Sequence, residues 1–110
     1  GTFEKLQTAP GQVVPIGKLE AINREEVSIE GTVKVLWESD SPAIKQVGLI
    51  EDESGTTKLT SWVASNQPWI EEGERVRIRG AAKNWYNGRV SVALTGWSSV
   101  IFPERGRWWE

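Results

Sequence analysis

The sequence predicts an all-β domain, and three observations support that prediction. Stretches of alternating apolar and polar residues recur along the chain, as expected of strands that bury one face. Short segments rich in glycine, asparagine and aspartate lie between them and are typical of turns. One internal segment, residues 64–73, has the character of a short helix or helical turn, with Gly73 at its end.

The first predicted strand covers residues 26–37. Four of its apolar residues share one parity, so we expect these four to face the core. They are Val27, Ile29, Val33 and Val35. Gly31 interrupts this row, and a glycine inside a strand indicates a bulge or a sharp coil. The first strand is therefore long enough to take part in two regions of a curled sheet.

Four more strands follow, with turn signals between them. They are expected over residues 44–50, 57–63, 75–82 and 89–97. The segment Asp52-Glu53-Ser54-Gly55 predicts the turn between the second and third strands, and Asn87-Gly88 predicts a hairpin between the fourth and fifth. In the fifth strand, Val90, Val92 and Leu94 are expected to face inward.

Five antiparallel strands with a short helix between the third and fourth are the plan of the five-stranded OB-fold barrel, a Greek key. We expect this barrel over residues 15–102, preceded by an N-terminal extension (1–14) and followed by a C-terminal tail (103–110). Residues 16–22 predict one helical turn that covers an open end of the barrel. At 110 residues the chain has room for one such domain.

The composition argues against most enzymes. The chain contains no cysteine and no histidine, which excludes disulfides, thiolate metal sites, serine–histidine triads and histidine acid–base chemistry. Carboxylate chemistry alone remains, and no pair of acids has a spacing that implies a shared cleft. We therefore expect no enzyme activity, no cofactor and no metal. No apolar run approaches the length of a membrane span, so we expect no membrane partner and a cytoplasmic, nucleoid-associated protein.

The net charge is also informative. A formal charge of −2 and a pI near 5.3 argue against binding duplex DNA through a dense basic surface. Arg75, Arg77 and Arg79 nevertheless share one parity, which predicts a local basic row on an acidic protein. The same pattern also fits an ordinary solvated strand face.

The third predicted strand carries the most informative pattern. If Leu59, Ser61 and Val63 face the core, Lys58, Thr60 and Trp62 stand together on the opposite surface. An aromatic ring beside a cation suits a nucleic-acid strand, because the ring stacks on a base while the ammonium group meets a phosphate. The alternative is that a neighbouring loop covers Trp62, which then serves only the fold.

Seven tryptophans in 110 residues are more than a core of this size needs, so we expect some of them to be exposed and functional. Trp37 lies at the mouth of the loop after the first strand. Its odd-numbered parity groups it with the inward valines, so a place in the core and a place at the binding surface stay equally open for it.

Several segments together resemble the DNA-binding OB domains of the replication protein A family, in particular archaeal single-stranded DNA-binding proteins. They are Pro15-Ile16, Leu19, Val27-x-Ile29-x-Gly31-x-Val33, the turn at residues 51–55, Lys58-x-Thr60-x-Trp62, Gly73-x-x-Val76 and Asn87-Gly88. The resemblance implies a groove across the second and third strands that holds single-stranded DNA. It places Trp62 at a base-stacking position, and it places a second stacking residue in the hairpin, where Trp85 and Tyr86 are both candidates.

These observations predict a single-stranded DNA-binding domain that acts in DNA replication, repair or recombination, largely without sequence specificity. RNA is an alternative ligand, and other OB domains or subunits of a replication protein A-like complex are expected partners. The predicted site residues are Trp62, Lys58, Thr60, Trp85, Tyr86, Trp37, Lys34, Lys45, Arg77, Arg79, Lys83 and Arg89.

Two other classes of binding domain fit the tryptophans less well. A protein-interaction OB module would use surface tryptophans, or the tail with Trp108 and Trp109, to dock a partner. A carbohydrate-binding domain would stack sugar rings on them. The lysines and arginines that neighbour Trp62 and Trp85 in the sequence favour nucleic acid over sugar.

Overall fold

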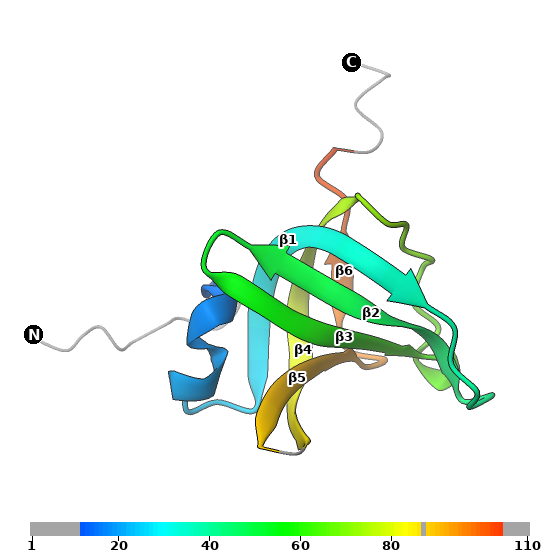
Figure 1. Ribbon diagram of the computed structural model, residues 1–110, viewed down its shortest axis with the longest axis horizontal. Helices are drawn as coiled ribbons and strands as arrows, with labels where there is room; N and C mark the ends of the chain where they lie inside the picture. Colours follow the sequence, from blue (N-terminus) through cyan, green and yellow to red (C-terminus); the bar gives the residue numbers. More distant parts are fainter. Residues whose placement is uncertain (1–11, 87, 105–110) are drawn as a thin grey trace, which may run out of the picture.

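A computed structural model describes residues 12–86 and 88–104 of the chain. Its main feature is a closed barrel in which the strands follow the order β1-β2-β3-β5-β4, and a pairing between β1 and β4 closes the ring. Figure 1 shows β2 and β3 crossing the front of the barrel. The strands are β1 (Glu26–Trp37), β2 (Ile44–Asp52), β3 (Gly55–Trp62), β4 (Arg75–Tyr86), β5 (Arg89–Leu94) and β6 (Ser99–Ile101). The predicted all-β barrel is confirmed, but its strands are not all antiparallel, because β3 and β5 pair in parallel.

The first strand is shared between two neighbours. Its first half pairs with β4 and its second half with β2, so β1 bends around the barrel. Gly31 lies where the pairing changes, and a Cβ atom there would stand 2.3 Å from the carbonyl oxygen of Glu51. Any larger residue would push β2 away, so this glycine is required for the close approach of the two strands.

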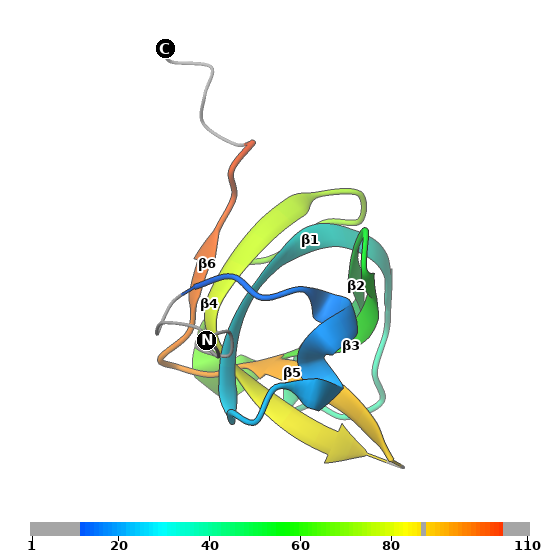
Figure 2. The ribbon, with the colours of Figure 1, turned by 90° about the vertical axis from the view of Figure 1, so that its left-hand side faces the viewer.

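The barrel interior holds the core, built from alternate residues of all five strands. The largest fully buried side chains are Leu19, Ile29, Ile50, Ile78, Leu94, Val33, Val76 and Val92. Leu19 comes from outside the sheet, from the 3₁₀ helix η2 (Ile16–Ala21). Figure 2 looks into the end of the barrel that η2 covers, which confirms the role expected for residues 16–22.

A carboxylate fastens η2 to the turn between β2 and β3. Asp52 Oδ2 accepts a hydrogen bond from the amide of Ile16 (2.9 Å), and Oδ1 accepts from the amides of Ser54 (2.7 Å) and Gly55 (3.1 Å). The Ser54 hydroxyl also donates to Oδ1 at 2.5 Å. Burial raises the pKa of Asp52, but these hydrogen bonds outweigh burial and lower the pKa below its ordinary value.

A bulge in β1 reverses the side of the sheet on which the residues after it stand. Val33 pairs with Ile50 inside the barrel, but Val35 pairs with Leu49, so one residue of β1 is skipped in the register. The skip moves Val35 and Trp37 to the outer face and turns Leu36 toward the core, against which it packs. The expectation that Val35 faces inward was therefore wrong. The bulge lies beyond Gly31, not at it.

The connection from β3 to β4 is less helical than expected. The helix predicted over residues 64–73 is only the 3₁₀ helix η3 (Val63–Ser65), which ends at Asn66 in the left-handed conformation (φ 54°). The expectation that Val63 faces the core was wrong, because β3 ends at Trp62 and Val63 is 54% exposed. Side chains hold the rest of the connection against the barrel: the Gln46 amide exchanges hydrogen bonds with the backbone of Ile70 (2.7 and 2.9 Å).

A sixth strand was not predicted. The fifth strand ends at Leu94 and not near Trp97, and after a turn the short β6 pairs with β4. The register of β4 against β1 slips near Gly80, whose φ of 75° suits a residue without a side chain. This slip lies where β4 passes from its pairing with β5 to its pairing with β6.

Candidate nucleic-acid interface

The outer surface of β1, β2 and β3 brings the central candidates together. Trp37 lies opposite Val47 in the register, and Val47 lies opposite Thr60. Residues directly opposite one another share a face of the sheet. Trp62 follows two residues after Thr60 and therefore stands on the same face. We call this surface the strand face, and its members are Val35, Trp37, Val47, Leu49, Lys58, Thr60 and Trp62.

The two tryptophans of the strand face are partly exposed and partly packed. Trp37 is 45% exposed and Trp62 is 39% exposed, whereas Val47 between them is 4% exposed although it faces outward. Trp37 is the direct cross-strand neighbour of Val47, and Trp62 is its diagonal neighbour, which is within reach of an aromatic side chain. The indole rings thus rest on an apolar floor and keep part of their surface open, as a stacking platform requires.

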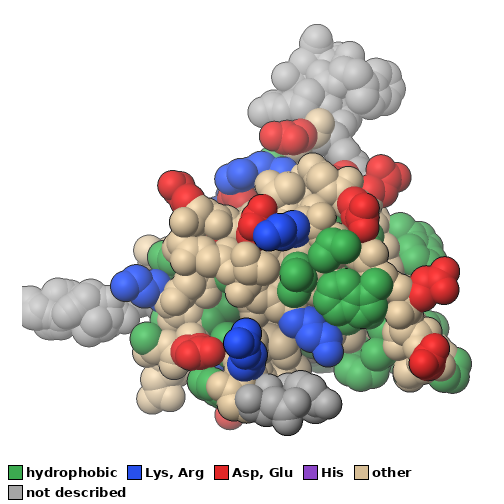
Figure 3. Space-filling view, in the orientation of Figure 1, with side chains coloured by type: hydrophobic (Ala, Val, Ile, Leu, Met, Phe, Trp, Pro, Cys, Tyr) green, Lys and Arg blue, Asp and Glu red, His purple; other side chains and the backbone are tan. Residues whose placement is uncertain are grey.

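Positive charge lies beside this floor. Lys58 is exposed on the strand face, opposite Leu49, and has Ser91 of β5 as its other neighbour. Lys58 and Arg89 line one cavity, between the strand face and η2. Figure 3 shows hydrophobic side chains gathered over β1, β2 and β3, with Lys and Arg side chains above and below them and acidic side chains along the right-hand edge. The arrangement suits a polymer whose flat aromatic bases are joined by anionic phosphates.

Lys34 lies at the bulge of β1 and forms an ion pair with Glu51. Its Nζ atom is 3.7 Å from Glu51 Oε1, and both side chains are well exposed. An exposed pair of this kind contributes little to stability. Lys34 is therefore able to exchange the carboxylate for a phosphate at small cost.

Lys45, another predicted site residue, is occupied elsewhere. Its ammonium group donates to the carbonyl of Gln67 and lies 4.9 Å from the ring centroid of Trp69. Both partners belong to the connection between β3 and β4. Lys45 therefore holds this connection, and its contact with phosphate stays a prediction.

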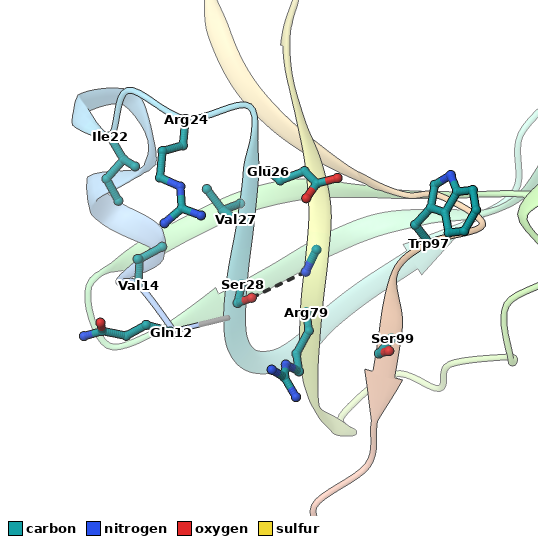
Figure 4. Close-up of a pocket in the computed structure, with 11 residues that line it drawn as sticks. Gln12, Val14, Ile22, Arg24, Glu26, Val27, Ser28, Arg79, Trp97 and Ser99 are labelled. Carbon is teal, nitrogen blue, oxygen red and sulfur yellow. Dashed lines mark hydrogen bonds between the residues drawn. The ribbon is translucent and has the colours of Figure 1, made fainter. Parts of the chain in front are cut away.

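The arginines of β4 do not join the strand face. Arg75, Arg77 and Arg79 do share one exposed row, as predicted, but β4 pairs with β1, β5 and β6 and not with β2 or β3. Arg75 donates to Glu30 at 2.8 Å, and Arg77 lies 3.9 Å from the same carboxylate. Figure 4 shows Arg79 beside β4, on a separate cavity whose lining also includes Arg24. Arg77 and Arg79 are therefore removed from the predicted groove.

The hairpin between β4 and β5 separates its two aromatic candidates. Trp85 lies opposite Val90 in the register. It has the same parity as Lys83, whose cross-strand partner Val92 is fully buried, so Trp85 and Lys83 stand on the inner side of β4. Trp85, which is 56% exposed, lines a cavity with residues 20–25, at the end of the barrel that η2 covers. It therefore points away from the strand face. Tyr86 pairs with Arg89 and has the opposite parity; its side chain is outside the part of the chain that the structure describes.

Lys83 has a structural place in the fold. Its ammonium group donates to the carbonyl of Leu19 (2.9 Å) and to that of Ile22. These carbonyls lie at the end of η2, where no further helical turn satisfies them. Lys83 thus caps the end of η2, and its contact with phosphate stays a prediction.

Sequence reasoning missed the apolar floor of the strand face. Val35, Val47 and Leu49 are apolar residues on the outer side of strands that also bury apolar residues on the inner side. The sequence of β2 did indicate an apolar outer side, because residues 47–50 contain no charged side chain and do not alternate between apolar and polar residues. In β1 the bulge concealed it, because Val35 has the parity of the inward residues.

Other classes of site find little support in residues 12–86 and 88–104. This part of the chain brings together no group of three or more acidic, histidine or cysteine side chains fit to hold a metal ion. Within it, no helix has the length and apolar character needed to cross a bilayer. Trp108 and Trp109, on which the protein-interaction alternative drew, lie outside the described residues.

Comparison with known proteins identifies the fold. An OB domain from Methanosarcina mazei is 32% identical to this chain, with a TM-score of 0.69, and the match covers 76% of this chain and 79% of that one. An OB domain from Thermoplasma acidophilum is 22% identical with a TM-score of 0.66, over 84% of this chain and 87% of the other.

A more distant similarity is to a murine DNA-binding protein solved with double-stranded DNA, at 18% identity and a TM-score of 0.63. The match covers 81% of this chain but only 46% of the murine chain. No protein-family model matches the sequence, and no curated protein matches it. The identity and coverage of the Methanosarcina match show that this chain belongs to the same family of OB domains.

Proposed function

We propose that this OB domain binds single-stranded DNA, with little sequence preference, on the strand face. The observation that carries the proposal is the pair of half-exposed tryptophans, Trp37 and Trp62, on an apolar floor with Lys58 beside them. Bases of a single strand are free to stack on these rings, whereas the bases of a duplex are already stacked on one another.

The expected energetics are those of a short, weak-to-moderate site. Stacking of each base contributes roughly 1–3 kcal/mol and hardly distinguishes sequence, because every base has a π face. Two or three platforms give a site of about 4–8 nucleotides, within the range of single OB folds. Cations at the margin would add a term that weakens as the salt concentration rises.

The proposed contact residues differ from the set predicted from the sequence. Stacking falls to Trp62 and Trp37, and the sequence resemblance proposes Tyr86 as the hairpin platform. Thr60 lies on the strand face two residues before Trp62, and 9% of its surface is exposed. Phosphate contacts fall to Lys58, Arg89 and Lys34.

The finer assignment is to the replication protein A family, with a role in DNA replication, repair or recombination. The sequence resemblance described above supports it, as does the similarity to two archaeal OB domains. Under this proposal the domain is a binding module of the cytoplasm and not an enzyme, it needs no cofactor, and its partners are single-stranded DNA and other OB domains or subunits. The murine protein was solved with double-stranded DNA, so a duplex is a necessary comparison in any test.

The experiment is a titration of intrinsic tryptophan fluorescence with a thymine oligonucleotide of about 15 bases, long enough to span one OB site. The matched duplex is titrated in parallel, and both titrations are repeated at low and high salt. Saturable quenching by the single strand alone, weaker at high salt, is the expected result. Equal quenching by the duplex would contradict single-strand selectivity. Absence of any change would favour the protein-interaction module.

A further inference from the structure

A second pair of tryptophans lines a hollow at the end of the strand face. Trp37 and Trp69 border a cavity of about 420 Å³ together with Leu36, Glu38, Ser39, Ile44, Lys45 and Gln46. We call this cavity the Trp69 notch. Trp69 is 60% exposed, and Trp37 belongs to both the notch and the strand face. The volume falls within the range of about 300–1,000 Å³ that is usual for small-molecule sites.

Contacts with Lys45, Gln46 and Leu36 hold the segment that carries Trp69 against the barrel. The Gln46 side chain bonds both the N–H and the carbonyl of Ile70, the residue that follows Trp69. Lys45 donates to the carbonyl of Gln67, and its ammonium group lies 4.9 Å from the Trp69 ring centroid. Glu72 accepts a hydrogen bond from the amide of Leu36 at 2.8 Å, which ties the same connection to β1. Because the backbone around Trp69 is already anchored, the exposed ring needs little ordering when a ligand binds.

The geometry points to the Trp69 notch as a site for one more base of the bound single strand, next to a base stacked on Trp37. This inference rests on the proposed function. Continuity supports it, because Trp37 is shared between the strand face and the notch, so a strand that stacks on Trp37 has Trp69 as its next ring. The segment around Trp69 is already anchored, so binding of a base there does not require this segment to become ordered.

Charge selects the base rather than the phosphate as the group that enters. Glu38 lines the notch and Glu72 is bonded to Leu36 in its wall. Lys45, the cation of the notch, is already engaged by a carbonyl and by the Trp69 ring. A phosphate would thus meet the Glu38 carboxylate and a cation that a carbonyl and the Trp69 ring already hold, whereas an uncharged base meets two indole rings, with Ser39 and Glu38 available to its polar edge.

The test compares Trp69→Leu and Trp69→Phe in the full chain, with Trp97→Leu as the matched control. Trp97 is 90% exposed and lies on the turn between β5 and β6, so its loss removes a surface tryptophan outside both sites. Affinity for a labelled thymine oligonucleotide of about 15 bases is measured by fluorescence anisotropy at several salt concentrations. Urea unfolding of each variant reports whether the fold is kept.

We expect Trp69→Leu to weaken binding by about 5- to 150-fold, the equivalent of one lost stacking interaction. Trp69→Phe should keep most of the affinity, and Trp97→Leu should match the wild type. Because no phosphate contact is removed, the slope of log affinity against log salt should stay unchanged in Trp69→Leu. Photocrosslinking of the wild type to an iodouracil oligonucleotide should place an adduct on Trp69, and this result does not depend on any variant folding.

The outcomes separate the two claims. If the wild type binds and Trp62→Ala weakens binding while Trp69→Leu equals Trp97→Leu and no adduct forms on Trp69, the notch inference is wrong and the proposed function stands. If Trp69→Leu changes the salt slope, a phosphate and not a base occupies the notch, which also overturns the inference. If the wild type fails to bind any single strand, the proposed function itself fails.

Discussion

Replacement of Trp37 by alanine is the perturbation that the bulge of β1 makes informative. Without the bulge, the parity of Trp37 would place it in the core with Val33, and its loss would unfold the domain. With the bulge, Trp37 stands outside, 45% exposed, beside Val47. We therefore expect Trp37→Ala to fold and to bind single-stranded DNA more weakly.

The stability cost follows from the exposed fraction. A fully buried tryptophan covers roughly 150–250 Å², so the packed part of Trp37 covers roughly 80–140 Å², worth about 2–3.5 kcal/mol at ~25 cal/mol per Å². This is an upper bound, because the unfolded chain also buries part of that area. A domain of ordinary stability, about 5–15 kcal/mol, remains folded after this loss.

The binding cost is set by stacking. Loss of one platform should weaken affinity for a thymine oligonucleotide by about 5- to 150-fold, measured by anisotropy, while urea unfolding shows a lower midpoint with an unchanged slope. Trp37→Phe keeps a ring and should recover most of the affinity. Two results would refute the reasoning: an unfolded Trp37→Ala, which would put the residue in the core, or a folded variant that binds like the wild type.

Three further predictions concern neighbouring features. Tyr86→Ala should lower affinity by about 5- to 150-fold while Trp85→Ala changes it less than about twofold, since one stacking interaction is lost only in the former; the reverse order in an anisotropy titration would show that hairpin parity is misassigned. Lys83→Met should leave the affinity for DNA unchanged but cost about 1–3 kcal/mol in urea unfolding, because two carbonyls of η2 lose their charged donor; an affinity loss with intact stability would return Lys83 to the groove. Asp52→Asn should cost about 1–2 kcal/mol near neutral pH. Since the pKa of Asp52 is lowered on folding, the carboxylate stabilises the fold above its ordinary value of 3.8, and the gap between wild type and variant should close as the pH falls through the lower, folded value; a gap independent of pH in chemical unfolding would contradict this.

Much of the fold could be predicted because it depends on local patterns. Alternation in β1, β3 and β5, together with the hairpin signal at Asn87-Gly88, indicated where barrel strands lie along the chain. The placement of Trp62 beside Lys58, opposite the inward Leu59 and Ser61, was also correct, since β3 has no bulge between these residues. Within a regular strand, period two is a reliable guide to facing.

The remaining errors arose where facing depends on long-range pairing. The skip between Val33 and Val35 inverts every later residue of β1, and no residue type at that point marks it. For Arg77 and Lys83, parity gave a face of β4 but not the neighbours of β4 in the closed barrel, and these neighbours decide whether a cation meets DNA, Glu30 or the end of η2. The register between distant strands is the information that one sequence did not supply.

The most direct test of the strand face is an NMR titration that follows the indole N–H resonances of the seven tryptophans. A thymine oligonucleotide of about six bases, close to the expected site size, is added to the labelled protein. The account predicts saturable shifts for Trp37 and Trp62 with no shift for Trp97. Shifts at Trp97 or Trp85 without any at Trp37 and Trp62 would contradict it.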